Sequence, residues 1–307
     1  MTRPLSGTQY EISFGDYTAH IASIGASLRA LTHRGRDLVV PFAAEEMRPA
    51  YRGAALAPWP NRVADGRYVF DGVAQQLPLT EPERGNALHG LASWLDFGAI
   101  EQTPSRVTLG ATIVPQAGYP HRVDVEVVYE LTEFGLFSSI TGSNSGTDAA
   151  PWGAGPHPYL VAGPGHVDDW SLLLPADEVL EVTPDRLLPV GLLPVAGAEG
   201  GAFDFREARP IGDVFIDHAF TTIARGAGGT ASVEIRTAEG TGVAISWDAA
   251  CPWVQVHTAD QPDPATSRRG LAVEPMTCPP GAFNSGTDLV TLAPGASHGA
   301  GWTISAL

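Results

Sequence analysis

The chain has 307 residues, of which 44% are hydrophobic, a content typical of a globular protein rather than a disordered one. Its formal net charge of −16 argues against binding to nucleic acid, which depends on cationic side chains, and against an anionic membrane surface. All 18 basic residues are arginines, and the absence of lysine excludes Schiff-base aldolases, pyridoxal-phosphate enzymes and Walker-type NTPases.

Glycine and proline, at 35 and 26 residues, predict many turns and few long helices. The cysteines, Cys251 and Cys278, have neither a CxxC nor a zinc-site spacing and suit buried thiols in a reducing compartment. The first residues lack the apolar segment of a signal peptide, and no apolar run approaches the roughly 18 residues of a membrane span. These features predict a cytoplasmic protein.

Short strands are predicted along the whole chain. Apolar and polar residues alternate in 10–14, 18–24 and 123–131, which indicates strands with one buried and one exposed face. Asp71-Gly72 indicates a hairpin of 67–70 with 73–77. The other predicted strands are 38–42, 106–114, 135–141, 170–174, 178–182, 231–236, 241–247, 253–258, 271–275, 288–292 and 301–307.

The order of these elements predicts the fold class. Residues 183–207 are rich in proline and glycine and are expected to form a surface crossover. We find no convincing amphipathic helix, no repeat and no shift in composition along the chain. Many short strands separated by turns predict an all-β protein, a large antiparallel sandwich or barrel, with a single domain over residues 1–307.

His157 lies on an unusually stiff segment. Pro156 and Pro158 flank it, and each proline fixes φ near about −65° and donates no backbone hydrogen bond. Gly153 and Gly155 precede them and allow conformations closed to other residues. Such a segment also suits a purely structural turn, so the segment alone does not define a site.

Glu274 ends an apolar run and is followed by Pro275 and Met276. A carboxylate in this context is costly to bury unless it is paired or functional. Burial would raise its pKa, which suits a general base near neutral pH. The alternative is a solvent-exposed glutamate at the end of a strand.

Other polar residues lie in loops rich in glycine and proline. Asn61 and Arg62 beside Trp59 suggest a sugar platform, because aromatic faces and planar hydrogen-bonding side chains hold polyhydroxy rings. The plain alternatives are an ion pair for Arg62, a turn cap for Asp217 and a satisfied histidine beside a tight turn for His89. The signatures GxGxxG, HExxH and GxSxG, the EF-hand loop and Cys-His zinc spacings are absent from the sequence.

Taken in chain order, these residues and their neighbours resemble the aldose 1-epimerase (galactose mutarotase) family. The resemblance spans nearly the whole chain, and its specificity lies in the order of the motifs rather than in any one of them. It implies the family's β-supersandwich, which agrees with the predicted strands. The matching segments are Pro58-Trp59-Pro60-Asn61-Arg62-Val63, Asn86-Ala87-Leu88-His89-Gly90, Gly155-Pro156-His157-Pro158-Tyr159, Asp217-His218-Ala219-Phe220, Gln255-Val256-His257-Thr258, Ala272-Val273-Glu274-Pro275 and Leu292-Ala293-Pro294-Gly295.

The resemblance implies acid–base chemistry on a sugar, without a metal or an organic cofactor. Glu274 would take the proton from the C1 hydroxyl of a hexose, and His157 would protonate the ring oxygen, so that the ring opens. Rotation about C1–C2 and reclosure would give the other anomer. His89 would assist or orient the acid. The substrate-binding residues that the resemblance implies are Arg62, Asp217, Asn61 and Gln255.

The sequence departs from the common family pattern at several positions and leaves the substrate open. His89 is followed by Gly90-Leu91 where many members have two glycines, and Trp59-Pro60 replaces smaller residues. The substrate could be a neutral hexose or a hexose charged at C6, such as sulfonated glucose or a hexose 6-phosphate. A charged substituent needs fixed cationic partners. The candidate cations are Arg52, Arg84, Arg122, Arg268 and Arg269.

Two hypotheses of other classes remain at this point. A non-catalytic carbohydrate-binding domain would need Arg62 and the aromatic platform, but not Glu274 together with His157. A glycosidase or lyase would need two catalytic carboxylates, and Asp217 with Glu274 would be the pair to test.

Overall fold

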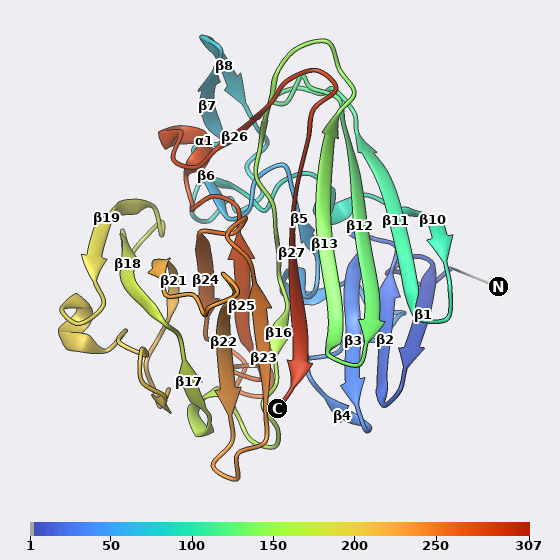
Figure 1. The fold of residues 1–307 in the computed structure, drawn as a ribbon. Coiled ribbons are helices and arrows are strands. Elements are labelled where there is room, and N and C mark those ends of the chain that lie inside the picture. Colours follow the sequence, from blue (N-terminus) through green and yellow to red (C-terminus); the bar gives the residue numbers. More distant parts are fainter. Residues whose placement is uncertain (1–2) are drawn as a thin grey trace.

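The computed structural model describes residues 3–307, and its largest element is a nine-stranded antiparallel sheet (Figure 1). β12 alternates as predicted, with Val123, Val125 and Val127 buried and Asp124 and Glu126 exposed. The strands in spatial order are β10 (Gly98–Gln102), β11 (Arg106–Ile113), β12 (Val123–Thr132), β13 (Gly135–Asn144), β27 (Ser297–Ala306), β23 (Gly242–Trp247), β22 (Ala231–Arg236), β17 (Ser171–Leu173) and β20 (Arg209–Pro210).

A six-stranded sheet carries much of the candidate site. Its central strands, β24 and β25, are almost fully buried because both faces of this sheet are covered. The strands in spatial order are β16 (Tyr159–Leu160), β25 (Leu271–Met276), β24 (Trp253–His257), β21 (Asp217–Ile223), β18 (Ala176–Val182) and β19 (Pro189–Pro194).

A third sheet and several short strand pairs complete the fold. β1 and β2 contact β12 across the core, and the Tyr129 hydroxyl donates a hydrogen bond of 2.7 Å to the Ala26 carbonyl. The third sheet consists of β1 (Gln9–Phe14), β2 (Tyr17–Ala22), β3 (Ser27–His33) and β4 (Arg36–Asp37). The short pairs are β5 (Ala55–Leu56) with β15 (Gly155–Pro156), β6 (Arg62–Ala64) with β9 (Asn86–Leu88), β7 (Arg67–Phe70) with β8 (Val73–Gln76) and β14 (Ala150–Trp152) with β26 (Val290–Leu292).

The all-β prediction is confirmed. One continuous cluster of buried apolar side chains joins the large sheets, with Trp152, Trp170 and Phe220 among its largest members. The described part of the chain contains a single α-helix of one turn, α1 (Ala282–Ser285). No helix within residues 3–307 is long and apolar enough to cross a membrane.

Three local predictions differ from the structure. Residues 38–42 do not form a strand, because Leu38 and Val39 are buried as part of a loop that forms only an isolated bridge from Val39 to Leu160. The predicted crossover contains β19, an edge strand, where proline is tolerated because one row of N–H groups faces away from the sheet. β3 and β10 were not predicted from the sequence.

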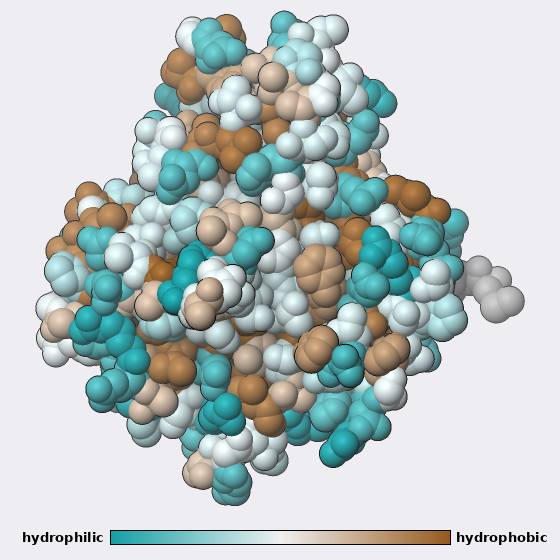
Figure 2. Space-filling view, viewed as in Figure 1, coloured by the Kyte–Doolittle hydropathy of each residue, from teal (hydrophilic) through white to brown (hydrophobic). Residues whose placement is uncertain are grey.

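The surface and the cysteines follow ordinary rules for a folded domain. On the face shown in Figure 2, hydrophobic residues lie in small separate areas between hydrophilic ones. Both Cys251 and Cys278 are free and buried. Burial raises the pKa of each thiol, so neither is a reactive thiolate near neutral pH.

Candidate active site

One pocket brings together all seven residues that the sequence singles out. Its volume is about 140 Å³. The predicted residues in its lining are Asn61, Arg62, His89, His157, Asp217, Gln255 and Glu274, and the others are Ala50, Tyr51, Leu88, Tyr159, His257 and Gln261.

The register of the six-stranded sheet places the polar side chains on one face. Gln255 in β24 lies directly opposite Glu274 in β25, and Asp217 in β21 lies opposite His257 in β24. Side chains of directly opposed residues point to the same face, and so do those of residues two apart along a strand. The Gln255 side-chain amide donates a hydrogen bond of 2.7 Å to Asp217 Oδ1, which fixes both side chains.

The segment that carries His157 is anchored at both sides. The His157 N–H donates to the Ala54 carbonyl at 3.2 Å, and the Gly53 N–H donates to the His157 carbonyl at 2.8 Å. Tyr159 begins the pairing with β25, the strand of Glu274, and its ring stacks on His157 with 5.0 Å between the ring centroids. The proline-flanked segment therefore holds the imidazole against the strand of Glu274.

Glu274 and His157 face each other inside the pocket. Glu274 Oε1 lies 3.4 Å from His157 Nε2, and both side chains are buried. Glu274 Oε2 and His157 Nδ1 are buried and have no hydrogen-bond partner among the described residues. A buried acid and base with unpartnered atoms are an arrangement for proton transfer.

Burial favours the neutral form of both groups. Burial and, to a smaller extent, the nearby Asp217 carboxylate raise the pKa of Glu274 well above its ordinary value, although Arg62 opposes this shift. Burial and the neighbouring His257 lower the pKa of His157 to about 3. Burial therefore shifts the pair toward a carboxylic acid beside a neutral imidazole.

His89 is held in a defined orientation by Asn61. The backbone N–H of Asn61 donates to the ring atom Nδ1 of His89 at 3.2 Å, and the backbone N–H of His89 donates to the backbone carbonyl of Asn61 at 2.9 Å. Because Nδ1 accepts, the neutral ring carries its proton on Nε2. Burial and the nearby His157 lower the pKa of His89 well below its ordinary value, so it is a neutral hydrogen-bond donor. Its ring meets His157 edge-on at 5.0 Å.

Arg62 is fixed by a buried carboxylate that the sequence analysis did not identify. Its Nε and Nη2 donate to Glu81 at 2.9 and 3.0 Å, and Nη2 also lies 3.7 Å from Asp217 Oδ2. Burial, the largest single effect, would lower the pKa of Arg62, but the Glu81 hydrogen bonds and the nearby carboxylates of Asp217, Glu81 and Glu274 together raise it. Arg62 therefore forms the ion pair that the sequence analysis gave as the plain alternative, and it also lines the pocket.

The aromatic platform is not the one expected. Trp59 is buried and packs on Phe283, with 5.3 Å between the ring centroids. It packs in the core beneath the loop of Asn61 and does not line the pocket. Tyr51 and Tyr159 line the pocket in its place. The strand period could have identified His257, because it is two residues after Gln255 and shares its face. No sequence signal identified Tyr51, which reaches the site from a separate loop.

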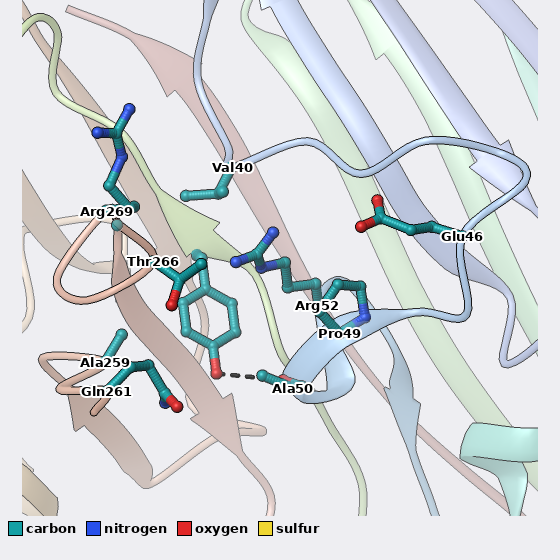
Figure 3. A pocket seen from close by; sticks show the side chains of 11 residues that line it. Val40, Glu46, Pro49, Ala50, Arg52, Ala259, Gln261, Thr266 and Arg269 are labelled. Atoms are coloured by element: carbon teal, nitrogen blue, oxygen red, sulfur yellow. Dashed lines mark hydrogen bonds between the residues drawn. The ribbon is translucent and has the colours of Figure 1, made fainter. Parts of the chain in front are cut away.

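A second cavity adjoins this pocket and contains two of the candidate arginines (Figure 3). Arg52 and Arg269 line it together with Glu46, and it shares Tyr159 with the pocket. The Arg52 guanidinium lies 5.9 Å from the centroid of the Tyr159 ring, and its buried Nε has no partner among residues 3–307. The Tyr159 hydroxyl donates to the Ala50 carbonyl at 3.1 Å, at the boundary between the two spaces.

The other candidate arginines have different surroundings. Arg84 donates to Glu81 at 3.2 Å. Arg268 pairs with Asp168 and Asp260 and so ties two loops together. Arg122 is exposed and lines neither space. Among residues 3–307, no cluster of three or more His, Cys, Asp or Glu side chains is arranged to hold a metal ion.

Fold and pocket together define a β-sandwich protein with a buried acid–base pair in a polar pocket. The sequence matches the family model described as aldose 1-epimerase over residues 8–305, and the chain belongs to this family. It is 40% identical over 294 residues to the "uncharacterized protein YihR" of Escherichia coli (strain K12), covering 95% of this chain and 91% of that protein.

Two further comparisons agree with this assignment. The galactose mutarotase of Rattus norvegicus is 30% identical over 221 residues, which cover 66% of this chain and 62% of that protein. The crystal structure of a GalM/aldose epimerase homologue from C. elegans has the same fold, with a TM-score of 0.85 at 20% identity and 98% of each chain covered. The predicted family and its β-supersandwich are thereby confirmed.

Proposed function

We propose that the protein is an aldose 1-epimerase that interconverts the α and β anomers of a hexose. The observation that carries the proposal is the buried Glu274–His157 pair, 3.4 Å apart, with Glu274 Oε2 and His157 Nδ1 unpartnered. Membership of the aldose 1-epimerase family supports the same reaction class.

The proton balance of the reaction suits this pair. Glu274 as a carboxylate removes the proton from the C1 hydroxyl while protonated His157 gives its proton to the ring oxygen, so the C1–O5 bond breaks and an aldehyde forms. The pair then consists of a carboxylic acid and a neutral imidazole, the form that burial favours. Rotation about C1–C2 and the reverse transfers close the ring as either anomer and need no cofactor.

The remaining polar groups of the pocket would hold the sugar. Arg62 and His89 present N–H donors, and Asp217 presents carboxylate oxygens as acceptors. Gln255 Oε1 is buried without a partner among the described residues and is therefore a further acceptor. Asn61 acts mainly by orienting His89, since its backbone makes both hydrogen bonds to that residue.

Anomer exchange tests the proposal directly. Freshly dissolved α-glucose and α-galactose are followed to equilibrium by polarimetry or NMR, with the wild type, Glu274→Gln and His157→Asn. The wild type is expected to accelerate the exchange of at least one sugar, and each variant is expected to lose a factor of about 10²–10⁴. A wild type without any acceleration would contradict the proposal, and a fully active Glu274→Gln would contradict the assignment of the base.

A second candidate substrate, a hexose charged at C6, is favoured by the arginine-lined cavity. Arg52 is half-buried with an unpartnered Nε, and Arg269 comes from a separate loop. In Figure 3 the Arg52 guanidinium points toward the side on which Arg269 and Thr266 lie. Fixed guanidinium groups beside a sugar pocket suit a sulfonate or a phosphate, although Glu46 on the same cavity reduces the positive charge.

Charge selectivity separates the two substrates. We expect Arg52→Gln and Arg269→Gln to lower kcat/KM for a C6-sulfonated glucose more than for glucose. Arg122→Gln removes the same charge from an exposed position and serves as the matched control. Equal effects on both sugars would leave the neutral hexose as the substrate.

The same purified protein also tests the two hypotheses of other classes. A non-catalytic carbohydrate-binding domain would bind a hexose without accelerating anomer exchange. A glycosidase that uses Asp217 with Glu274 would release the leaving group from an aryl glycoside. We also propose a cytoplasmic location, which the free and buried cysteines support.

A further inference from the structure

The buried Glu81 carboxylate binds Arg62 with two hydrogen bonds and accepts two more, and we call this arrangement the clamp. Its side chain is 4% exposed. Oε2 accepts hydrogen bonds from Arg62 Nε at 2.9 Å and Asn86 Nδ2 at 3.0 Å. Oε1 accepts from Arg62 Nη2 at 3.0 Å and Arg84 Nη1 at 3.2 Å. Two parallel hydrogen bonds fix the plane of a guanidinium, so Glu81 sets the direction in which Arg62 presents its remaining N–H groups.

Backbone hydrogen bonds fix the loop that carries Glu81, although Glu81 does not line the pocket itself. The N–H groups of Glu81 and Asn86 donate to each other's carbonyls at 3.0 and 3.2 Å, which closes the loop between them. β9 continues from Asn86 and pairs with β6, where Arg62 lies opposite Leu88. Glu81 is therefore connected to the pocket through Arg62, which lines it.

Charge compensation is the second role of the clamp. Burial, the largest single effect, would raise the pKa of Glu81, but the hydrogen bonds and charge of Arg62, with Asn86 and Arg84, together lower it, so Glu81 stays ionised. Arg62 in turn lowers the pKa of Glu274 against the effect of burial. An Arg62 charge without compensation would draw protons away from the buried pair. The titratable groups that face Glu274 are His157, Asp217, Arg62, His257 and Tyr159, and those that face Glu81 are Arg62, Arg84 and Tyr51.

We propose that Glu81 is a positioning residue, which orients Arg62 toward the sugar and neutralises the Arg62 charge beside the Glu274–His157 pair. The inference rests on the proposed epimerase function. It assigns a role in the reaction to a residue outside the pocket. That role has two separable parts, the orientation of the Arg62 side chain and the compensation of its charge.

Three variants separate these effects. Glu81→Gln keeps the shape and removes the charge, so kcat/KM falls by on the order of tenfold and the whole pH profile moves to lower pH. Glu81→Asp keeps the charge and shortens the reach, so KM rises while the pH profile stays in place. Glu83→Gln removes the same charge from an exposed position in the same loop and is expected to match the wild type.

Several outcomes would overturn the inference. It fails if Glu81→Gln has the pH profile of the wild type, if Glu83→Gln shifts the profile equally, or if Glu81→Asp has an unchanged KM. Should Glu81→Gln not fold, Glu81→Asp still decides whether reach matters, because a purely structural role would lower the melting temperature without raising KM. A wild type without anomer exchange would instead refute the proposed function, and carbon-13 NMR titration of the Glu274 carboxyl in wild type and Glu81→Gln would still measure the charge effect.

Discussion

The three histidines of the pocket differ in what their Nδ1 atoms meet. Nδ1 of His89 accepts a hydrogen bond from the Asn61 N–H. Nδ1 of His257 lies 3.3 Å from the Ile216 carbonyl oxygen and must therefore donate. Nδ1 of His157 has no partner among the described residues. The same residue type is thus held in three different ways within one pocket, and His157 is the one of the three whose Nδ1 has no partner among the described residues.

Glu274→Gln is expected to separate catalysis from stability. The variant loses the proposed base, so anomer exchange is expected to fall by about 10²–10⁴. It also removes a carboxyl whose ionisation is disfavoured by burial, so the melting temperature at neutral pH rises by roughly a few degrees. Calorimetry of wild type and variant checks the second part. A lower melting temperature would show that the carboxyl stabilises the fold instead.

The pH dependence of kcat/KM follows from the shared proton. Activity needs one proton on the Glu274–His157 pair and is lost when the pair gains a second or loses the first. Burial lowers the pKa of His157 to about 3, so the acid limb is expected below the ordinary pKa of histidine. Burial raises the pKa of Glu274, so the alkaline limb lies well above the ordinary pKa of glutamate. An acid limb at the ordinary histidine pKa would contradict this account.

At the scale of elements, prediction from the sequence succeeded where the local signal was strong. Alternation identified β12, and Asp71-Gly72 identified the hairpin of β7 and β8. β10 was missed because all its residues are exposed, which leaves no alternation to detect. Residues 38–42 were wrongly predicted as a strand, because an apolar run indicates that residues are buried but not that they pair in a sheet.

The sequence did not predict how the residues of the candidate site are arranged. All seven singled-out residues line one pocket, but the roles given to them came from a family resemblance. Glu81 was missed because a glutamate in a polar loop looks exposed until Arg62 is placed against it. The pairing of Gln255 with Glu274 depends on sheet register, which local sequence does not specify.

The turn after His89 is expected to be sensitive to any added side chain. Gly90 has φ of +71°, and a Cβ there would lie 2.1 Å from the Ala57 carbonyl oxygen. Gly72 has φ of +76°, and a Cβ there would meet open space. Both alanine variants carry a backbone strain of about 1–3 kcal/mol, but only Gly90→Ala also displaces the loop of His89. Urea unfolding and anomer exchange should show the larger loss for Gly90→Ala, and equal losses would contradict the contact.

At the scale of the molecule, distant parts of the chain meet in the centre of the large sheet. β27, near the end of the sequence, lies between β13 and β23 (Figure 1). The six-stranded sheet likewise places β16 beside β25. His157 precedes β16 and Glu274 lies in β25, so the two residues meet only when this long-range pairing is complete.

Substitutions in β27 and β19 should therefore differ strongly in effect. Ile304 in β27 is fully buried, and Ile304→Ala is expected to lower the free energy of unfolding by about 2–5 kcal/mol. Leu192 in the edge strand β19 is 44% exposed, and Leu192→Ala is expected to change it by about 0.5 kcal/mol or less. Chemical denaturation of both variants measures the difference. Similar values would mean that the central strand does not dominate stability.

The burial of both cysteines has a practical consequence for work in solution. Cys251 and Cys278 are shielded from reagents, and the chain contains no lysine. A single cysteine introduced at an exposed site would therefore be the one readily labelled side chain of the native protein, without removal of any natural residue. A fluorophore attached at Gln261, which lines the pocket and is exposed, would report sugar binding directly, including in variants that no longer turn over.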